Sequence, residues 1–140
     1  MIIFKNFFCT ILLHPQEHML HLVWLQQPDT SNLLAIYNKA IDLSIGHAVK
    51  FWIADNHRGF NFDVCMQRAL AELCATRLYD TQVLRFARII PMDVFQELVS
   101  HKMRNMMNQL VVNEVEFEVF SQVEEAKFWL QQVDALSAIA

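Results

Sequence analysis

Glycine and proline are scarce in this chain, with 2 glycines and 3 prolines among 140 residues. The glycines stand at positions 46 and 59. The motifs GxGxxG, GxxxxGK[ST] and GxSxG, which need glycine where the backbone turns sharply or approaches a phosphate group, do not occur. Because a loop that wraps a phosphate can hardly be built with so little glycine, we expect no nucleotide and no other cofactor.

Cysteine is also rare, and the number and spacing of the cysteines do not suggest disulfide pairs. The three cysteines, at 9, 65 and 74, are odd in number and form no CxxC pair. A disulfide framework is therefore not expected, and a reducing cytoplasm fits best. We expect the cysteines at 65 and 74 to be small buried side chains of a helix.

Dense basic segments and long apolar runs are missing as well. The formal net charge is −4 and Lys and Arg are dispersed, which argues against a nucleic-acid partner. No run reaches the roughly 18 apolar residues that a membrane span requires. The run FFCTILL after Lys5 is short and lacks a small-residue cleavage pattern, so it predicts a first strand rather than a signal peptide.

Hydrophobic residues are abundant, at 54% of the chain against 19% charged residues. The length suits one domain, residues 1–140, with a single core. A hydrophobic excess of this kind is typical of a chain whose surface is partly covered by another subunit. We therefore expect a homo-oligomer, most simply a dimer, with a further protein partner as an open alternative.

The hydrophobic pattern predicts an α/β fold. Two apolar runs flank Pro15-Gln16-Glu17 and predict a β-hairpin, with a break near Lys5-Asn6 that could divide the first run. Farther on, helical and strand periods alternate. The predicted helices span about 33–48, 63–77, 93–106 and 121–136, and the later strands about 51–54, 83–90 and 115–120.

Together these elements predict a mixed sheet of five to six strands with an N-terminal β-hairpin and four helices. Arg85 and Arg88 interrupt the strand at 83–90. For the third helix, the apolar residues and their spacing predict a buried stripe of Val94, Phe95, Leu98, Val99, Lys102, Met103 and Met106.

The stretch FWIADNHRGF, residues 51–60, is the first candidate site. It reads as a buried strand that delivers Asp55, Asn56, His57 and Arg58 to the carboxyl edge of the sheet, where ligands of α/β proteins commonly bind. Arg58 could hold an anion while His57 shuttles protons. Alternatively, Asp55 accepts backbone N–H bonds within its own turn and Arg58 pairs with Asp55 or Asp63. The structural, ligand-binding and catalytic interpretations all stay open, and we name no catalytic residue.

Two further groups of side chains have a functional and a structural interpretation. His14, Glu17, His18 and His21 carry metal-binding atoms, but their spacing suits no closed site, and a strand would place His18 and His21 on opposite faces. We therefore predict no metal. The methionine stripe consists of Met103, Met106 and Met107. It is either part of the core or, where exposed, a dimer surface.

Three segments resemble STAS-like domains, the anti-sigma-factor-antagonist fold, and in particular small stand-alone bacterial STAS/SEC14-like members. They are WIADNHRGFNF, RFARIIPMDVFQELV and FEVFSQVEEAKFWL, within residues 50–130. The resemblance implies the α/β sheet described above. Regulatory members are switched by phosphorylation of a Ser or Thr just after the strand that corresponds to 51–54. Here that loop reads DNHRGFN and offers no hydroxyl, so we do not carry the switch over.

From these patterns we expect a non-enzymatic regulatory or protein-interaction domain that acts as a homodimer in the cytoplasm. The SEC14-like side of the resemblance suggests an alternative, a protein that binds a small apolar ligand or lipid in a cavity lined by residues such as Phe51, Trp52 or Phe95. A third hypothesis is an enzyme that uses Asp55 and His57.

Overall fold

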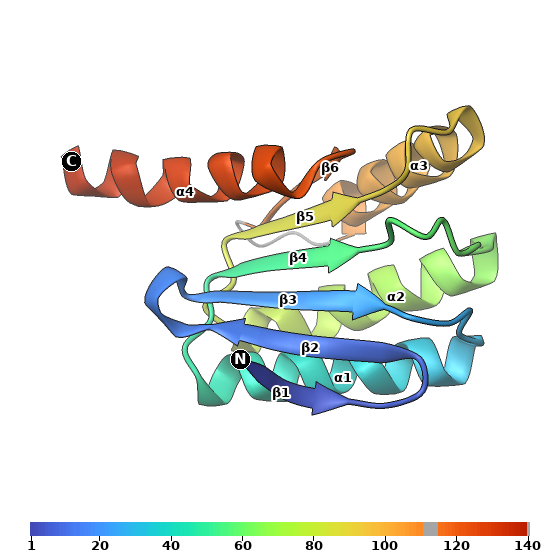
Figure 1. Cartoon of the computed structure of the whole chain (residues 1–140), viewed down its shortest axis with the longest axis horizontal. Helices are drawn as coiled ribbons and strands as arrows, with labels where there is room; N and C mark the ends of the chain where they lie inside the picture. The colour runs from blue at the N-terminus through green and yellow to red at the C-terminus, as the bar shows by residue number, and fades with distance from the viewer. Residues whose placement is uncertain (111–114, 140) are drawn as a thin grey trace.

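The computed structural model describes residues 1–110 and 115–139, which form a six-stranded mixed sheet and four α-helices (Figure 1). The strands are β1 (Ile2–Lys5), β2 (Cys9–His14), β3 (Met19–Trp24), β4 (Phe51–Asp55), β5 (Arg85–Ile89) and β6 (Glu116–Phe120). The helices are α1 (Thr30–Gly46), α2 (Val64–Arg77), α3 (Val94–Leu110) and α4 (Val123–Ile139). The predicted α/β class, N-terminal hairpin and helix number are confirmed.

The strands lie in the sheet in the same order as in the chain, β1 to β6. The pairs β1–β2 and β2–β3 are antiparallel, and β3 to β6 run parallel. The predicted break in the first apolar run is real, because the Asn6 carboxamide oxygen accepts the N–H groups of Phe8 and Cys9, each at 2.9 Å, in the turn between β1 and β2.

The parallel strands β3 to β6 follow one another across the sheet, always toward the same edge. Right-handed crossovers between them therefore place α1, α2 and α3 on the same face of the sheet. Figure 1 shows α1 and α2 behind the strands. The core on this face centres on neighbouring aromatic rings, with centroids 5.4 Å apart for Trp52–Phe86 and for Phe86–Phe117. The buried indole of Trp52 donates to the Ser44 hydroxyl at 2.8 Å, so the indole N–H of Trp52 is satisfied within this core.

The last helix, α4, packs on the opposite face. There Ala126 and Leu130 contact a second apolar cluster that includes Phe51, Ile53 and Ile89. This helix covers β4, β5 and β6, and on the same face His14 of β2 and His21 of β3 stay half-exposed.

Helix α3 has a different orientation from the one its apolar pattern predicts. It buries Gln96, Ser100, Met103 and Met107, whereas Val94, Phe95 and Leu98 are 84%, 59% and 55% exposed. The predicted stripe is thus wrong for Val94, Phe95 and Leu98, and also for Lys102, which is exposed. The physical reason is that both polar side chains find partners beneath the helix: Gln96 donates to the Gly59 carbonyl at 2.9 Å, and Ser100 accepts from Arg88 at 3.0 Å.

This orientation also decides between the two interpretations of the methionine stripe, in favour of the core. Met103 and Met107 belong to the core, where they are unavailable to a second subunit, and Met106 is half-buried against it. In the described part of the chain, no helix combines the length and the apolar character needed to cross a bilayer.

Candidate functional site

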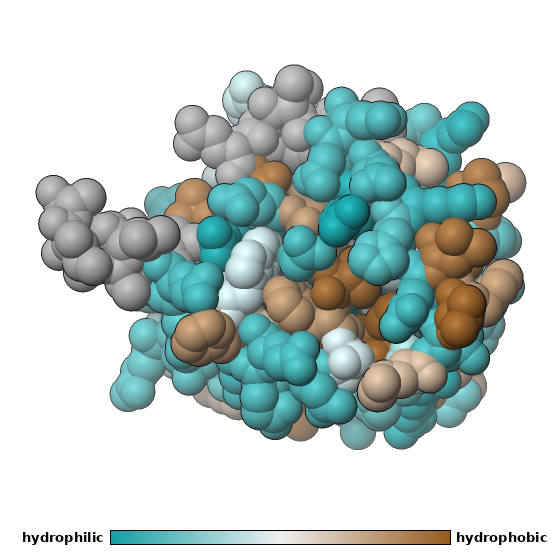
Figure 2. All heavy atoms as spheres, turned by 90° about the horizontal axis from the view of Figure 1, so that it is seen from above, coloured by the Kyte–Doolittle hydropathy of each residue, from teal (hydrophilic) through white to brown (hydrophobic). Residues whose placement is uncertain are grey.

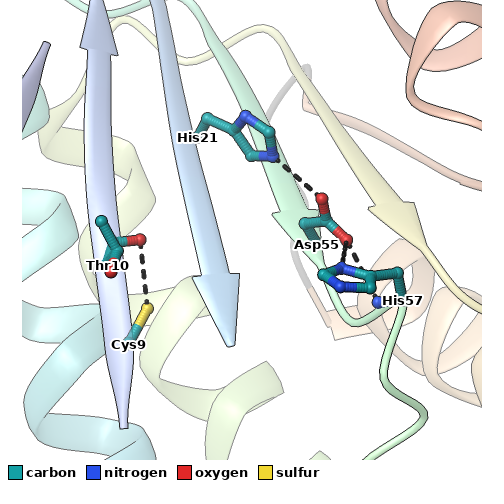
Figure 3. Close-up of polar contacts among 5 residues, drawn as sticks. All are labelled: Cys9, Thr10, His21, Asp55 and His57. Carbon is teal, nitrogen blue, oxygen red and sulfur yellow. Dashed lines mark hydrogen bonds and ion pairs between the residues drawn. The ribbon is translucent and has the colours of Figure 1, made fainter. Parts of the chain in front are cut away.

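The candidate site is the corner at which β4 ends, on the carboxyl edge of the parallel strands. Strand alternation puts Asp55 on the same face as Phe51 and Ile53, the face that α4 covers in part. Figure 3 shows its carboxylate between two imidazole rings, one from β3 and one from the loop after β4. One carboxylate oxygen lies 3.2 Å from Nε2 of His21, and the other lies 2.8 Å from Nδ1 of His57.

The electrostatics of Asp55 favour its ionised form. Burial by itself acts to raise the pKa of this carboxyl group. The hydrogen bonds from the His21 ring, the His57 ring and the His57 backbone N–H, together with the charge of His57, outweigh burial and lower the pKa below its ordinary value. The corner therefore holds a fixed carboxylate beside His57, which is 54% exposed.

Asn56 and Gly59 make the turn rigid. The carboxamide of Asn56 donates to the Phe60 carbonyl at 3.0 Å and accepts the Phe60 N–H at 2.9 Å, while its backbone N–H donates to Ile89 at 2.9 Å. Gly59 has φ of +74°, a left-handed conformation that glycine adopts without strain. Because the polar atoms of Asn56 are engaged inside the loop, its geometry favours the structural interpretation for this residue.

Arg58 does not make either ion pair that the sequence suggested. Its guanidinium donates to the Leu25 carbonyl at 2.7 Å. Asp63 instead accepts the Met66 N–H at 2.9 Å as the N-cap of α2, and Asp55 is engaged by the two histidines. Arg58 and His57 remain the exposed polar side chains of the corner.

His21 is the residue that sequence reasoning did not assign to this site. It was grouped with His14 and His18, yet His18 lies in a left-handed turn at φ of +54°, and the described residues bring no three potential metal-binding side chains together. Parallel pairing of Val23 with Asp55 places His21 two residues earlier on the same face. The alternation of Met19, His21 and Val23 shows this face in the sequence, but it does not give the register with β4.

An exposed apolar cluster adjoins the corner at the start of α3. We define the α3 apolar cluster as Met92, Val94, Phe95 and Leu98. The Gln96–Gly59 hydrogen bond joins this turn of α3 to the loop after β4. Figure 2 shows hydrophobic atoms gathered at the right-hand end of the molecule, where Figure 1 places the beginning of α3.

Comparison of the chain with family models, with curated proteins and with solved structures gave no match.

Proposed function

We propose that the chain is a non-enzymatic STAS-like domain that acts through protein contacts and works as a homodimer, with the α3 apolar cluster as its docking surface. The observation that carries this proposal is the orientation of α3, which directs Gln96 and Ser100 inward and Val94, Phe95 and Leu98 outward. Contiguous apolar side chains on a surface are typical of protein–protein contacts.

A second copy of the chain is the simplest partner. Homo-oligomers with two-fold symmetry are the commonest assemblies. In such a dimer the same apolar patch of both copies is buried, because the two patches pack against each other. The corner after β4 is held rigid by Asn56 and by the Gly59–Gln96 hydrogen bond. It lies beside the α3 apolar cluster and supplies polar groups at the rim of that cluster. A rim of this kind around an apolar centre is the usual composition of an interface.

The apolar-ligand alternative has less support. Phe51 and Trp52 are buried in the two clusters on opposite faces of the sheet, and Phe95 is exposed, so these residues do not line one cavity. The cavity between β5, β6 and α3 has a volume of about 20 Å³. Pockets for lipid-sized ligands have volumes of several hundred Å³.

The cysteines support a reducing compartment as part of the proposal. Burial raises the pKa of Cys9 and of Cys74 to about 12, which keeps both side chains as thiols at neutral pH. Cys65 is free and exposed, so the expectation that it would be a buried side chain of the helix is wrong, whereas Cys74 is buried as expected. We propose the cytoplasm as its compartment, as the sequence suggested.

Sedimentation velocity of the full chain and of Leu98→Glu tests the proposal. We expect the wild type to sediment as a dimer and Leu98→Glu as a folded monomer, because a buried carboxylate at the interface lacks a partner. Phe128→Glu is the matched control, since Phe128 is an exposed apolar residue of α4, and it should remain dimeric. A monomeric wild type, or equal dimerisation of both variants, would overturn the proposal.

A further inference from the structure

A groove runs along α4 where this helix passes the end of β6. Its larger part has a volume of about 490 Å³ and is lined by Phe120, Glu124, Glu125, Phe128, Trp129 and Gln132. A smaller hollow of about 200 Å³ continues toward α3 and shares Phe120 and Glu125 with the larger part. We call the two hollows together the α4 groove. Its size is within the range of roughly 300–1,000 Å³ that is typical of ligand-binding pockets.

Three aromatic side chains give the α4 groove an apolar wall. The ring centroids of Phe120 and Trp129 lie 5.6 Å apart, and Phe128 is 67% exposed. The face of an aromatic ring carries partial negative charge and attracts cations. Trp129 already makes such a contact, because the guanidinium carbon of Arg85 lies 4.4 Å from its ring centroid. The wall is therefore suited to a cationic group as well as to apolar atoms.

The carboxylates at the α4 groove lack counterions. Glu124 and Glu125 belong to the first turn of α4, and Glu97 belongs to the first turn of α3. None of the three forms an ion pair with another described residue. Apart from His101, the described lining has no basic side chain. Each helix N-terminus supplies only about half a positive charge, so the three carboxylates leave the groove negative.

We propose that the α4 groove binds an arginine-bearing peptide segment of a partner protein. The planar guanidinium group of arginine stacks on aromatic faces and pairs with carboxylates through two parallel hydrogen bonds. The α4 groove offers both kinds of group, with Glu124 and Phe128 one helical turn apart on α4. Apolar side chains of the same segment contact Phe120 and Trp129.

Charge also decides against other occupants of the groove. A second copy of the chain would bring the same carboxylates together, and like charges repel. Nucleic acid and anionic lipid headgroups are repelled in the same way, and the formal net charge of −4 adds to this repulsion. The groove is open to solvent on one side, unlike the enclosed pocket that a lipid tail requires. The α4 groove therefore adds a partner of a different kind to the dimer proposed above and does not depend on that dimer.

Tryptophan fluorescence of the full chain tests the proposal, because one of its three tryptophans lies in the α4 groove. Trp24 and Trp52 are fully buried, whereas Trp129 is half-buried, so peptide binding changes mainly the emission of Trp129. In a titration with a hexa-arginine peptide we expect a saturable change of emission, and the binding should weaken as the salt concentration rises. A hexa-glutamate peptide should cause no change.

Two matched pairs of variants separate the groove from a general attraction between a basic peptide and an acidic protein. Glu125→Lys and Glu72→Lys change the net charge equally, but Glu72 is exposed on α2, on the other face of the sheet. The Kd for hexa-arginine should rise by about tenfold or more in Glu125→Lys and by less than about twofold in Glu72→Lys. Phe128→Ala should raise the Kd by about threefold, whereas Phe7→Ala, which removes a similarly exposed ring between β1 and β2, should leave it unchanged. A wild type without saturable binding, or equal effects within either pair, would overturn the proposal.

Discussion

At the scale of single residues, the corner after β4 shows how far sequence reasoning reaches. Asp55 and Asn56 are turn-forming residue types at the end of an apolar run, and the sequence identifies them. The partners of Asp55 and Arg58 could not be predicted in the same way. They depend on the register of β3 against β4 and on the path of the chain near Leu25, which are long-range properties of the fold.

Gly59 gives a prediction about the rigidity of this corner. An added Cβ would require a left-handed conformation and would lie 3.2 Å from the Pro91 ring, so we expect Gly59→Ala to destabilise the fold by at least about 1–2 kcal/mol. Gly46→Ala is the control, because a Cβ there has open space, and it should be neutral or stabilising by up to about 1 kcal/mol. Urea unfolding measures both, and equal effects of the two variants would refute the geometry of the loop.

Asp55 gives a pH-dependent prediction. Because its pKa is lowered in the folded state, the carboxylate stabilises the fold above the unfolded pKa, about 3.9, and this contribution disappears as pH falls through the folded value. Asp55→Asn should destabilise the protein by about 1–3 kcal/mol near neutral pH, and the difference from wild type should shrink in acid. Urea unfolding over this pH range provides the measurement, with exposed Asp80→Asn as a control that stays close to wild type. A constant difference at all pH values would contradict the role of the carboxylate.

At the scale of elements, α3 shows that hydrophobic periodicity predicts a helix but does not predict the rotation of that helix about its axis. Apolar residues spaced by three and four predict the existence of the helix, and Asp93 caps it by accepting the Gln96 N–H. The rotation of the helix about its axis is set elsewhere, because Gly59 and Arg88 provide partners for Gln96 and Ser100 that are invisible in the local pattern. The methionines Met103 and Met107 are consequently core residues.

A truncation pair tests the orientation of α3. In dilute protein, Phe95→Ala should change the free energy of unfolding by less than about 0.5 kcal/mol, because the ring is exposed. Met103→Ala should cost about 2–5 kcal/mol, since it leaves a cavity in the core. The stripe predicted from sequence alone would bury both residues, so a large loss in Phe95→Ala would show that α3 is rotated from the orientation described here.

At the scale of the whole molecule, the alternation of strand and helix patterns was sufficient for the fold class. Once the hairpin and the later strands are recognised, right-handed crossovers with strands in chain order place α1, α2 and α3 together and leave the opposite face for α4. The likeness to STAS-like domains and the dimer remain proposals. No local pattern in the sequence could show which apolar residues remain exposed to solvent, because their exposure depends on how α3 packs over β5 and β6.

Amide hydrogen exchange across residues 92–98, measured at increasing protein concentration, tests the proposed docking surface most directly. The first N–H groups of α3 lack intrahelical partners and exchange fast in a monomer. We predict that exchange in this segment slows as concentration rises in the wild type and does not slow in Leu98→Glu. Exchange that is independent of concentration in the wild type, or protection confined to another face, would contradict an interface built on the α3 apolar cluster.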